Sequence, residues 1–179
     1  MKLKTHLASA LAVSPFIAYC EPHVRFLLMG AAFPDIDLLF KEKQHRLSLF
    51  HSIEIPFIGL LLFLLVPVRY GYLAACFCAG WVVHLMGDMI QGGVRSLFLK
   101  RKVGFKKFYW DRYYNTPLGI FIDLFLLFLG FVGTFKVASE WDIAVLIPVF
   151  IAFFFGSAQK VFFALIGLTA IFLWLPVAI

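Results

Sequence analysis

The chain has 179 residues, 63% of them apolar, and its mean hydropathy is +0.94. A soluble globular domain is ~45–50% apolar, so this composition excludes an ordinary soluble protein and indicates an integral membrane protein. The length leaves room for one domain, residues 1–179. The net charge of +6 would favour a nucleic-acid partner in a soluble protein, so the positions of the charges matter more here than their sum.

The N-terminal segment, MKLKTHLASALAVSPFIAYC, resembles a secretory signal peptide, because a basic start precedes an apolar core. However, the bulky Tyr19 stands where a lipoprotein cleavage site needs a small residue. We therefore expect this segment to form the first membrane helix. The three cysteines lie in or beside apolar segments without a CxxC pair, so we expect them to pack as small hydrophobic residues.

Seven apolar runs follow along the chain and predict an all-α bundle of six or seven membrane helices. The runs span residues 6–20, 24–39, 52–68, 71–92, 116–135, 141–157 and 159–177. A helix needs about 20 residues to cross a ~30 Å hydrocarbon core, and the third, fourth and fifth runs are expected to cross fully. Pro15 and Pro34 interrupt the first two runs, for which tilted, broken or partial insertion stays open.

The basic residues predict the orientation of the bundle. With a cytoplasmic N-terminus and seven crossings, all of the 16 lysines and arginines except Arg25, Arg69 and Lys136 fall on the cytoplasmic side. Titratable residues gather at the same side. His84, 13 residues into the fourth run, lies ~20 Å from its outer end. We therefore expect a polar His/Asp cluster at the cytoplasmic edge.

Each element of this cluster also has a purely structural interpretation. His84 and Asp88, in HLMGD, are spaced i, i+4 and share one helical face, where they can chelate a metal or hydrogen-bond to each other. Asp35 and Asp37, in PDID, can simply end a helix after a proline. His51 followed by Ser52 and Glu54 can be helix-start chemistry, and Thr5 beside His6 can be a helix cap.

The combination favours a metal. Four of the five histidines and three aspartates come to one membrane face from separate segments. A charge buried at membrane depth costs ~2.5–3.5 kcal/mol or more, and a divalent cation would neutralise the two carboxylates of PDID. Imidazole and carboxylate ligands together suit zinc, and manganese or iron less exclusively.

The order of the motifs resembles that of one family. The motifs are TH at Thr5–His6, PDID at Pro34–Asp37, HR at His45–Arg46, HS at His51–Ser52, HLMGD at His84–Asp88 and GG at Gly92–Gly93. This series is similar to the YdjM family of LexA-regulated, membrane-bound, metal-dependent hydrolases, over roughly residues 1–100. Residues 101–179 form a second, helical half without such motifs.

The resemblance implies a protein of the bacterial inner membrane with a His/Asp metal site. The family is in turn distantly similar to zinc-dependent phospholipases C and single-strand nucleases, whose HxxxD elements bind zinc in helical bundles. A catalytic site of this kind would hydrolyse a phosphoester, because a bound metal lowers the pKa of water towards ~7 and polarises phosphoryl oxygens.

We assign expected roles to the residues of these motifs. The expected metal ligands are His51, His84 and Asp88, completed by Asp35, Asp37 and His6. The expected catalytic residues are Glu54, as general base or outer partner, with Arg46 and Asp37. Arg46 can bind phosphate oxygens bidentately or be an ordinary topology charge. The expected substrate-binding residues are Arg46, His45, Lys106 and Lys107.

The segment VRSLFLKRKVGFKKFYWDRYYN mixes seven basic residues with aromatic ones. Nucleic-acid binding is one interpretation. Beside a membrane, each lysine or arginine near anionic lipid contributes ~1 kcal/mol, and aromatic rings suit the headgroup layer. We therefore expect anionic lipid headgroups, and no nucleic acid, as partners, and a phospholipid or lipid-linked phosphate of the cytoplasmic leaflet as substrate.

Two other functions compete with hydrolysis. A non-catalytic metal-binding membrane protein would have a closed coordination shell, whereas a catalytic zinc keeps a position for water. A transporter is less favoured, because transport sites lie near the membrane midplane, often between repeated halves, and the sequence shows neither feature.

Overall fold

The computed structural model describes residues 3–39, 49–65, 70–91, 93–104 and 117–140, and most of them are helical. The helices are α1 (Leu3–Ile17), α2 (Glu21–Ala32), α3 (Glu54–Leu65), α4 (Gly71–Gln91) and α6 (Pro117–Glu140). Two 3₁₀ helices, η1 (Phe33–Leu39) and η3 (Leu49–His51), lie between α2 and α3 in the sequence. Two short strands, β1 (Val94–Ser96) and β2 (Arg101–Val103), follow α4.

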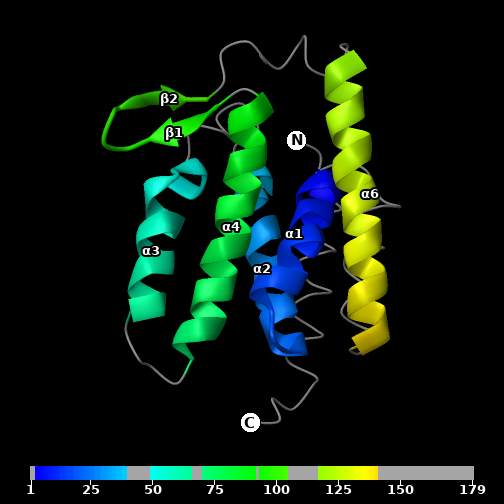
Figure 1. Ribbon diagram of the computed structural model, residues 1–179. Helices are drawn as coiled ribbons and strands as arrows, with labels where there is room; N and C mark the ends of the chain where they lie inside the picture. The colour runs from blue at the N-terminus through cyan, green and yellow to red at the C-terminus, as the bar shows by residue number, and fades with distance from the viewer. Residues whose placement is uncertain (1–2, 40–48, 66–69, 92, 105–116, 141–179) are drawn as a thin grey trace.

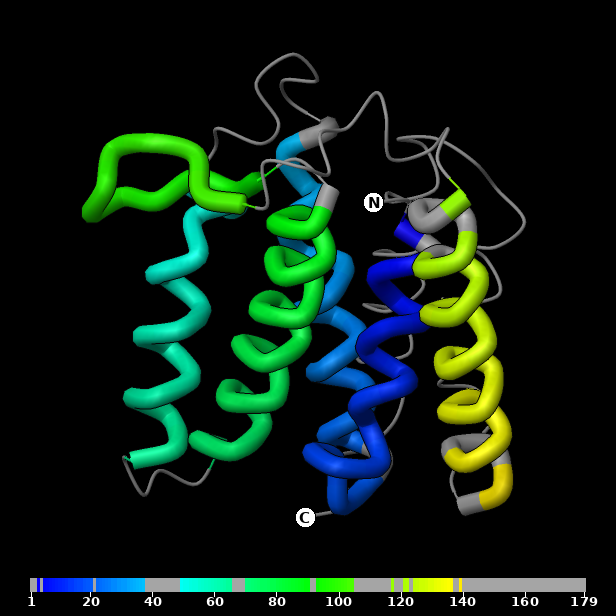
Figure 2. Tube along the Cα trace, turned by 45° about the horizontal axis from the view of Figure 1, so that its top comes forward, coloured from blue at the N-terminus to red at the C-terminus, as the bar shows by residue number. Residues whose placement is uncertain are grey.

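The helices stand side by side as a bundle with nearly aligned axes (Figure 1). α2 packs against α4, α1 against α2 and α6, and α3 against the other side of α4. The tube view shows that η1 and the β1–β2 hairpin lie at the same end as the N-terminus (Figure 2). This end, called the site end below, receives the start of α1 and the end of α4.

Glycine allows α2 and α4 to approach backbone to backbone. A Cβ atom added at Gly30 would overlap the carbonyl oxygen of Phe77, and one added at Gly80 would overlap the carbonyl oxygen of Leu27. Small residues let helices pack closely in membranes, where the hydrophobic effect does not drive them together. This close approach brings the end of α2 to the face of α4 that carries His84.

Large apolar side chains point outward from the bundle. Leu62 and Leu65 of α3 are 55% and 79% exposed, and Phe121 and Phe128 of α6 are 63% and 60% exposed. Most of the buried polar side chains among the described residues lie at the site end, and Ser14 and Arg25 are buried farther from it. A protein surrounded by lipid is expected to place apolar groups on its outside and polar groups in its interior.

The expected helices are confirmed in part. The first five apolar runs each coincide with a helix, and α1 continues through Pro15, whereas α2 changes to 3₁₀ geometry just before Pro34. Among the described residues, one helix, at Gly71–Ile90, is long and apolar enough to cross a membrane by itself. The runs at 141–157 and 159–177 lie outside the described residues, so the structure does not show six or seven spans.

The β1–β2 hairpin corrects the all-α prediction. Val94 pairs with Val103 and Ser96 with Arg101 in an antiparallel ladder, and Lys100 adopts a positive φ of 50° at the turn. Strands of three residues are too short to show the alternation by which a strand is recognised in a sequence. The hairpin occupies part of the basic segment that we expected to contact lipid.

Candidate metal centre

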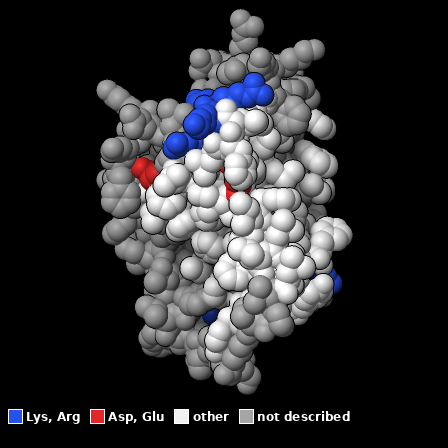
Figure 3. Space-filling view, turned by 90° about the vertical axis from the view of Figure 1, so that its left-hand side faces the viewer, with Lys and Arg blue, Asp and Glu red and all other residues white. Residues whose placement is uncertain are grey.

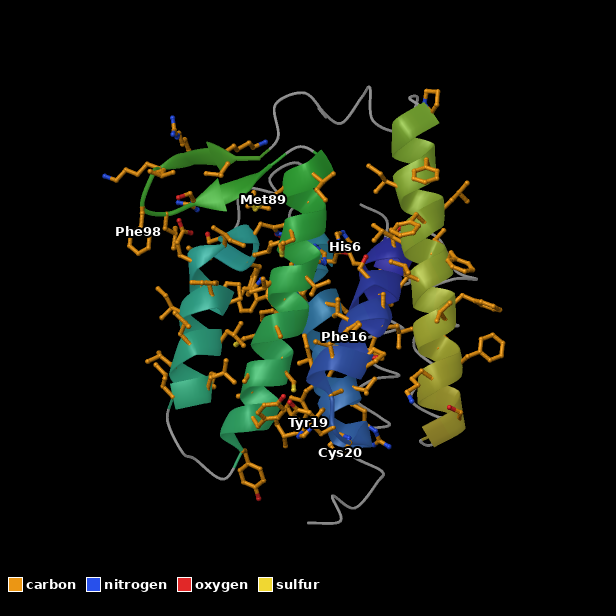
Figure 4. The ribbon with its side chains drawn as sticks, in the orientation of Figure 1. His6, Phe16, Tyr19, Cys20, Met89 and Phe98 are labelled. Carbon is orange, nitrogen blue, oxygen red and sulfur yellow. The ribbon has the colours of Figure 1, made fainter. Side chains whose placement is uncertain are left out.

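Three histidines and three aspartates from four segments meet at the site end. α1 provides His6, η1 provides Asp35 and Asp37, η3 provides His51, and α4 provides His84 and Asp88. In Figure 4, His6 lies on the side of α1 that faces α4. None of these six residues is more than 5% exposed. The cluster predicted from the motifs is therefore assembled, and it is buried.

One group of potential ligands consists of His6, His84 and Asp88. The Nε2 atom of His6 lies 3.5 Å from Oδ1 of Asp88, and Nε2 of His84 lies 3.6 Å from Oδ2 of the same carboxylate. The rings of His6 and His84 are stacked, with centroids 3.6 Å apart. The i, i+4 spacing in HLMGD thus places both side chains on one face, as predicted.

A second group consists of Asp35, His51 and His84. Nε2 of His84 lies 3.6 Å from Oδ1 of Asp35. Nε2 of His51 lies 3.5 Å from Oδ2 of Asp88, which links the two groups. Within each group, the candidate ligand atoms all lie within 4.8 Å of one another.

These separations fit a tetrahedral metal better than direct hydrogen bonds. Hydrogen bonds from nitrogen to oxygen span about 2.7–3.2 Å, whereas Nε2 and carboxylate oxygen are 3.5–3.6 Å apart here. Zinc binds imidazole and carboxylate at about 2.0–2.2 Å, so adjacent ligand atoms of a tetrahedral site lie about 3.3–3.6 Å apart. The spacing of the cluster therefore leaves room for a metal ion between the ligand atoms.

Outer contacts orient two of the imidazoles. Nδ1 of His84 lies 2.7 Å from the carbonyl oxygen of Ala31, to which it donates, so Nε2 presents its lone pair to the cluster. Nδ1 of His51 lies 3.0 Å from Oδ2 of Asp37 and leaves Nε2 directed at Asp88. Carboxylate or carbonyl partners of this kind fix the tautomer of metal-binding histidines.

The two aspartates of PDID point in different directions from η1, a 3₁₀ helix. With three residues per turn, side chains at i and i+2 point about 120° apart. Asp35 faces His84, and Asp37 faces His51. The two carboxylates consequently contact different histidines. Asp37 is an outer partner of His51, because its Oδ2 is hydrogen-bonded to Nδ1 and not to Nε2.

The surroundings of His51 favour its charged form. Burial lowers its pKa, but the hydrogen bond to Asp37 and the nearby negative charges of Asp37 and Asp88 outweigh burial and raise the pKa to about 9. Without a metal, His51 therefore holds a proton between two carboxylates at neutral pH. A metal that binds Nε2 has to replace that proton.

Buried polar atoms without a hydrogen bond mark the same place. Within the part of the chain that the structure describes, both ring nitrogens of His6 and Nε2 of His84 are buried and make no hydrogen bond. Leaving a buried polar group unsatisfied costs ~1–3 kcal/mol. A cation coordinated by these nitrogens would satisfy the Nε2 atoms.

The chain belongs to the YdjM inner membrane protein family. The sequence model of this family matches residues 1–166. The family resemblance predicted from the motifs is thereby confirmed, and it extends past residues 1–100 into the half that carries no recognised motif. No curated protein and no solved structure matches the chain. Membership establishes an inner membrane protein, and the His/Asp cluster is the site that this YdjM family member offers for a metal.

Glu54 does not join either group of ligands. Its Oε1 accepts hydrogen bonds from Ser96 Oγ and from the backbone N–H of Phe98, which lies 3.4 Å away. Glu54 thus fastens the hairpin to the start of α3, and its expected role as general base has no support from these contacts. Thr5 lies inside α1 and does not cap it.

Four expected substrate-binding or catalytic residues lie outside the described residues. These are His45, Arg46, Lys106 and Lys107. Arg46 and His45 belong to the segment between η1 and η3, and the two lysines follow β2 along the chain. Their roles remain predictions from the sequence.

Several contacts that build the site were not predicted. The carbonyl of Ala31 orients His84, and Nε1 of Trp81 donates to the carbonyl oxygen of Phe50 at 2.7 Å, which holds η3 beside α4. A backbone carbonyl has no sequence signature. The glycines at 30 and 80, each within an apolar run, were the available signal that α2 and α4 pack closely.

Proposed function

We propose that this protein is a membrane-embedded, metal-dependent hydrolase that cleaves a phosphoester of a phospholipid or another lipid-linked phosphate. The observation that carries the proposal is the position of the Asp88 carboxylate. One of its oxygens faces Nε2 of His6, and the other faces Nε2 of both His51 and His84. Three imidazole nitrogens around a carboxylate suit zinc, and manganese or iron less exclusively.

Each residue has a distinct part in holding such a metal. Nε2 of His84 has one lone pair and would bind one ion, whereas Asp88 directs its two oxygens to different histidines and would offer a ligand atom to either group. Asp37 holds the ring of His51 and stabilises its orientation. The metal itself would lower the pKa of bound water to about 7 and polarise the phosphoryl group.

We further propose that the site end faces the cytoplasm and that the protein is multi-pass with a cytoplasmic N-terminus. The hairpin at the site end carries Arg95, Lys100, Arg101 and Lys102. Lys136 lies near the opposite end of α6 (Figure 1). Membrane proteins keep an excess of lysine and arginine on the cytoplasmic side, which supports this orientation.

A non-catalytic metal site is the second candidate, and burial favours it. His51 and His84 are 0% exposed and Asp88 is 1% exposed, as in closed structural sites. A transport site is less favoured, because the cluster lies at one end of the bundle and transport sites usually lie near the midplane.

Hydrolysis tests the proposal. The zinc-loaded protein, purified in detergent, is mixed with phospholipid micelles, and release of phosphate or phosphorylated headgroup is measured. We expect activity that chelation removes and zinc restores, that Asp88→Asn lowers by more than about 100-fold, and that His23→Ala at the other end of the bundle leaves unchanged. Stoichiometric zinc without cleavage of any lipid phosphate would favour the non-catalytic candidate.

A further inference from the structure

The β1–β2 hairpin projects from the site end beside α3 (Figure 1). Its second strand and turn expose the basic residues Lys100, Arg101 and Lys102. The turn also exposes two large apolar side chains, since Phe98 is 77% and Leu99 is 54% exposed. One short ribbon therefore presents adjacent cationic and apolar groups.

The apolar part of the ribbon continues a lipid-facing surface. On α3, Leu61, Leu62 and Leu65 are 46%, 55% and 79% exposed. Figure 4 shows Phe98 pointing from the hairpin along the side of α3. In the space-filling view, lysine and arginine atoms form a band over this end, above a largely uncharged surface with small acidic patches close to the band (Figure 3). The boundary between the two has the character of a membrane–water interface.

The hairpin is fixed to the segment that holds a candidate ligand. The backbone N–H of Ile53 donates to the carbonyl oxygen of Arg95 at 3.3 Å, and Ser52 forms a parallel bridge with Arg95. Glu54 accepts from Ser96 and from the Phe98 backbone. Ser52 directly follows His51, so the hairpin and the metal centre are parts of one connected structure.

We propose that the β1–β2 hairpin docks on anionic phospholipid headgroups, with its Phe98–Leu99 turn dipping into the acyl layer beside α3. Each basic side chain near an anionic surface contributes ~1 kcal/mol, which corresponds to about fivefold in binding. Nucleic acid would also attract the basic residues, but it would leave Phe98 and Leu99 exposed to water. The proposal goes beyond the proposed hydrolysis and does not depend on it, because docking requires neither a metal nor a reaction.

Amide hydrogen exchange in nanodiscs tests this docking locally. The full chain is placed in nanodiscs of phosphatidylcholine alone or with increasing phosphatidylglycerol, and exchange is followed in peptides covering residues 97–103. The test variant is Arg101→Gln combined with Lys102→Gln. The matched control is Lys136→Gln, which removes an exposed basic residue at the other end of the bundle. Circular dichroism and size-exclusion chromatography establish that each variant is folded.

We expect phosphatidylglycerol to slow exchange of the hairpin in the wild type and in Lys136→Gln. The double variant should need about 25-fold more of the lipid, two factors of about five, so that its protection is lost in the accessible range. Phe98→Ser, which keeps the charges, should lower protection in both lipid compositions. Equal exchange with and without phosphatidylglycerol in the wild type would overturn the proposal. Protection by a single-stranded oligonucleotide in place of phosphatidylglycerol would also overturn it.

Discussion

The two ends of the bundle use histidine in different ways. Opposite the site end, His23 packs edge-on against Tyr72, with ring centroids 4.7 Å apart, and its Nδ1 accepts the backbone N–H of Tyr19 at 3.1 Å. At the site end, His51 and His84 use Nδ1 for outer contacts and direct Nε2 at carboxylates. At the site end, a histidine is thus a candidate ligand because its Nε2 faces carboxylates, and at His51 and His84 the other nitrogen is anchored as well. His23 instead lies in the first turn of α2, beside the rings of Tyr19 and Tyr72.

Metal removal should give the largest difference in unfolding midpoint between variants at the site end and variants at the opposite end. A metal bound at 100 to 1,000 times its Kd stabilises a folded protein by about 2.7–4.1 kcal/mol. We expect chelation to lower the unfolding midpoint of wild-type protein and of Tyr72→Phe, and to have no effect on Asp88→Ala. Thermal unfolding in detergent, with and without added zinc, measures this shift. A chelation effect that survives in Asp88→Ala would contradict the assignment.

The close packing of α2 against α4 can be disturbed without changing any candidate metal ligand. A methyl group at Gly30 meets the backbone of Phe77, whereas one at Gly59 meets Sγ of the Cys78 side chain at 2.9 Å. Backbone cannot move aside as a side chain can, so Gly30→Ala should destabilise by about 1–3 kcal/mol and weaken metal binding by displacing Ala31. Gly59→Ala should cost less and leave metal affinity unchanged. Unfolding curves and zinc titrations of both variants provide the comparison, and equal losses of affinity would contradict it.

The outer partner of His51 should have an intermediate effect. Asp37→Asn keeps the size of the side chain but removes the charge that orients the imidazole. Mutations of such partners typically lower metal affinity 10–100-fold, and we expect a loss in this range. Competition with a chelator of known affinity measures it. An affinity equal to that of the wild type would mean that Asp37 has no part in the metal centre.

The dependence of stability and of zinc affinity on pH should be the smallest of these effects. His51 has a folded pKa of about 9, above the ordinary value of 6.5 for histidine. In the metal-free protein, its contribution to stability is therefore complete below pH 6.5 and is lost as the pH rises through about 9. Metal binding displaces the same proton, so zinc affinity should rise by up to about tenfold per pH unit in that window. A zinc affinity independent of pH would contradict this exchange.

The sequence predicted the members of the site better than their arrangement. His84 and Asp88 follow from helix periodicity alone, because i and i+4 share a face. The different partners of Asp35 and Asp37 could not be predicted, since they depend on how η1 packs against η3 and α4. The hydrogen bonds of Glu54 could not be predicted either, because the hairpin that it holds is too short to be recognised in the sequence.

The predicted spans show a comparable limit. The hydropathy runs located α1 to α4 and α6 within a few residues. Hydropathy measures how apolar a segment is, and it does not report which helices pack together. The close contact of Gly30 with α4 determines how α2 packs on α4. This packing places the carbonyl of Ala31 where it orients His84.

Elemental analysis of the purified protein tests the central claim most directly. Wild type is compared with His84→Ala, Asp88→Ala and His23→Ala, each checked for folding by circular dichroism. We expect about one or two zinc, manganese or iron ions per chain in the wild type, retained in His23→Ala and lost in the other two variants. Folded wild-type protein that holds no metal even after supplementation would contradict the account.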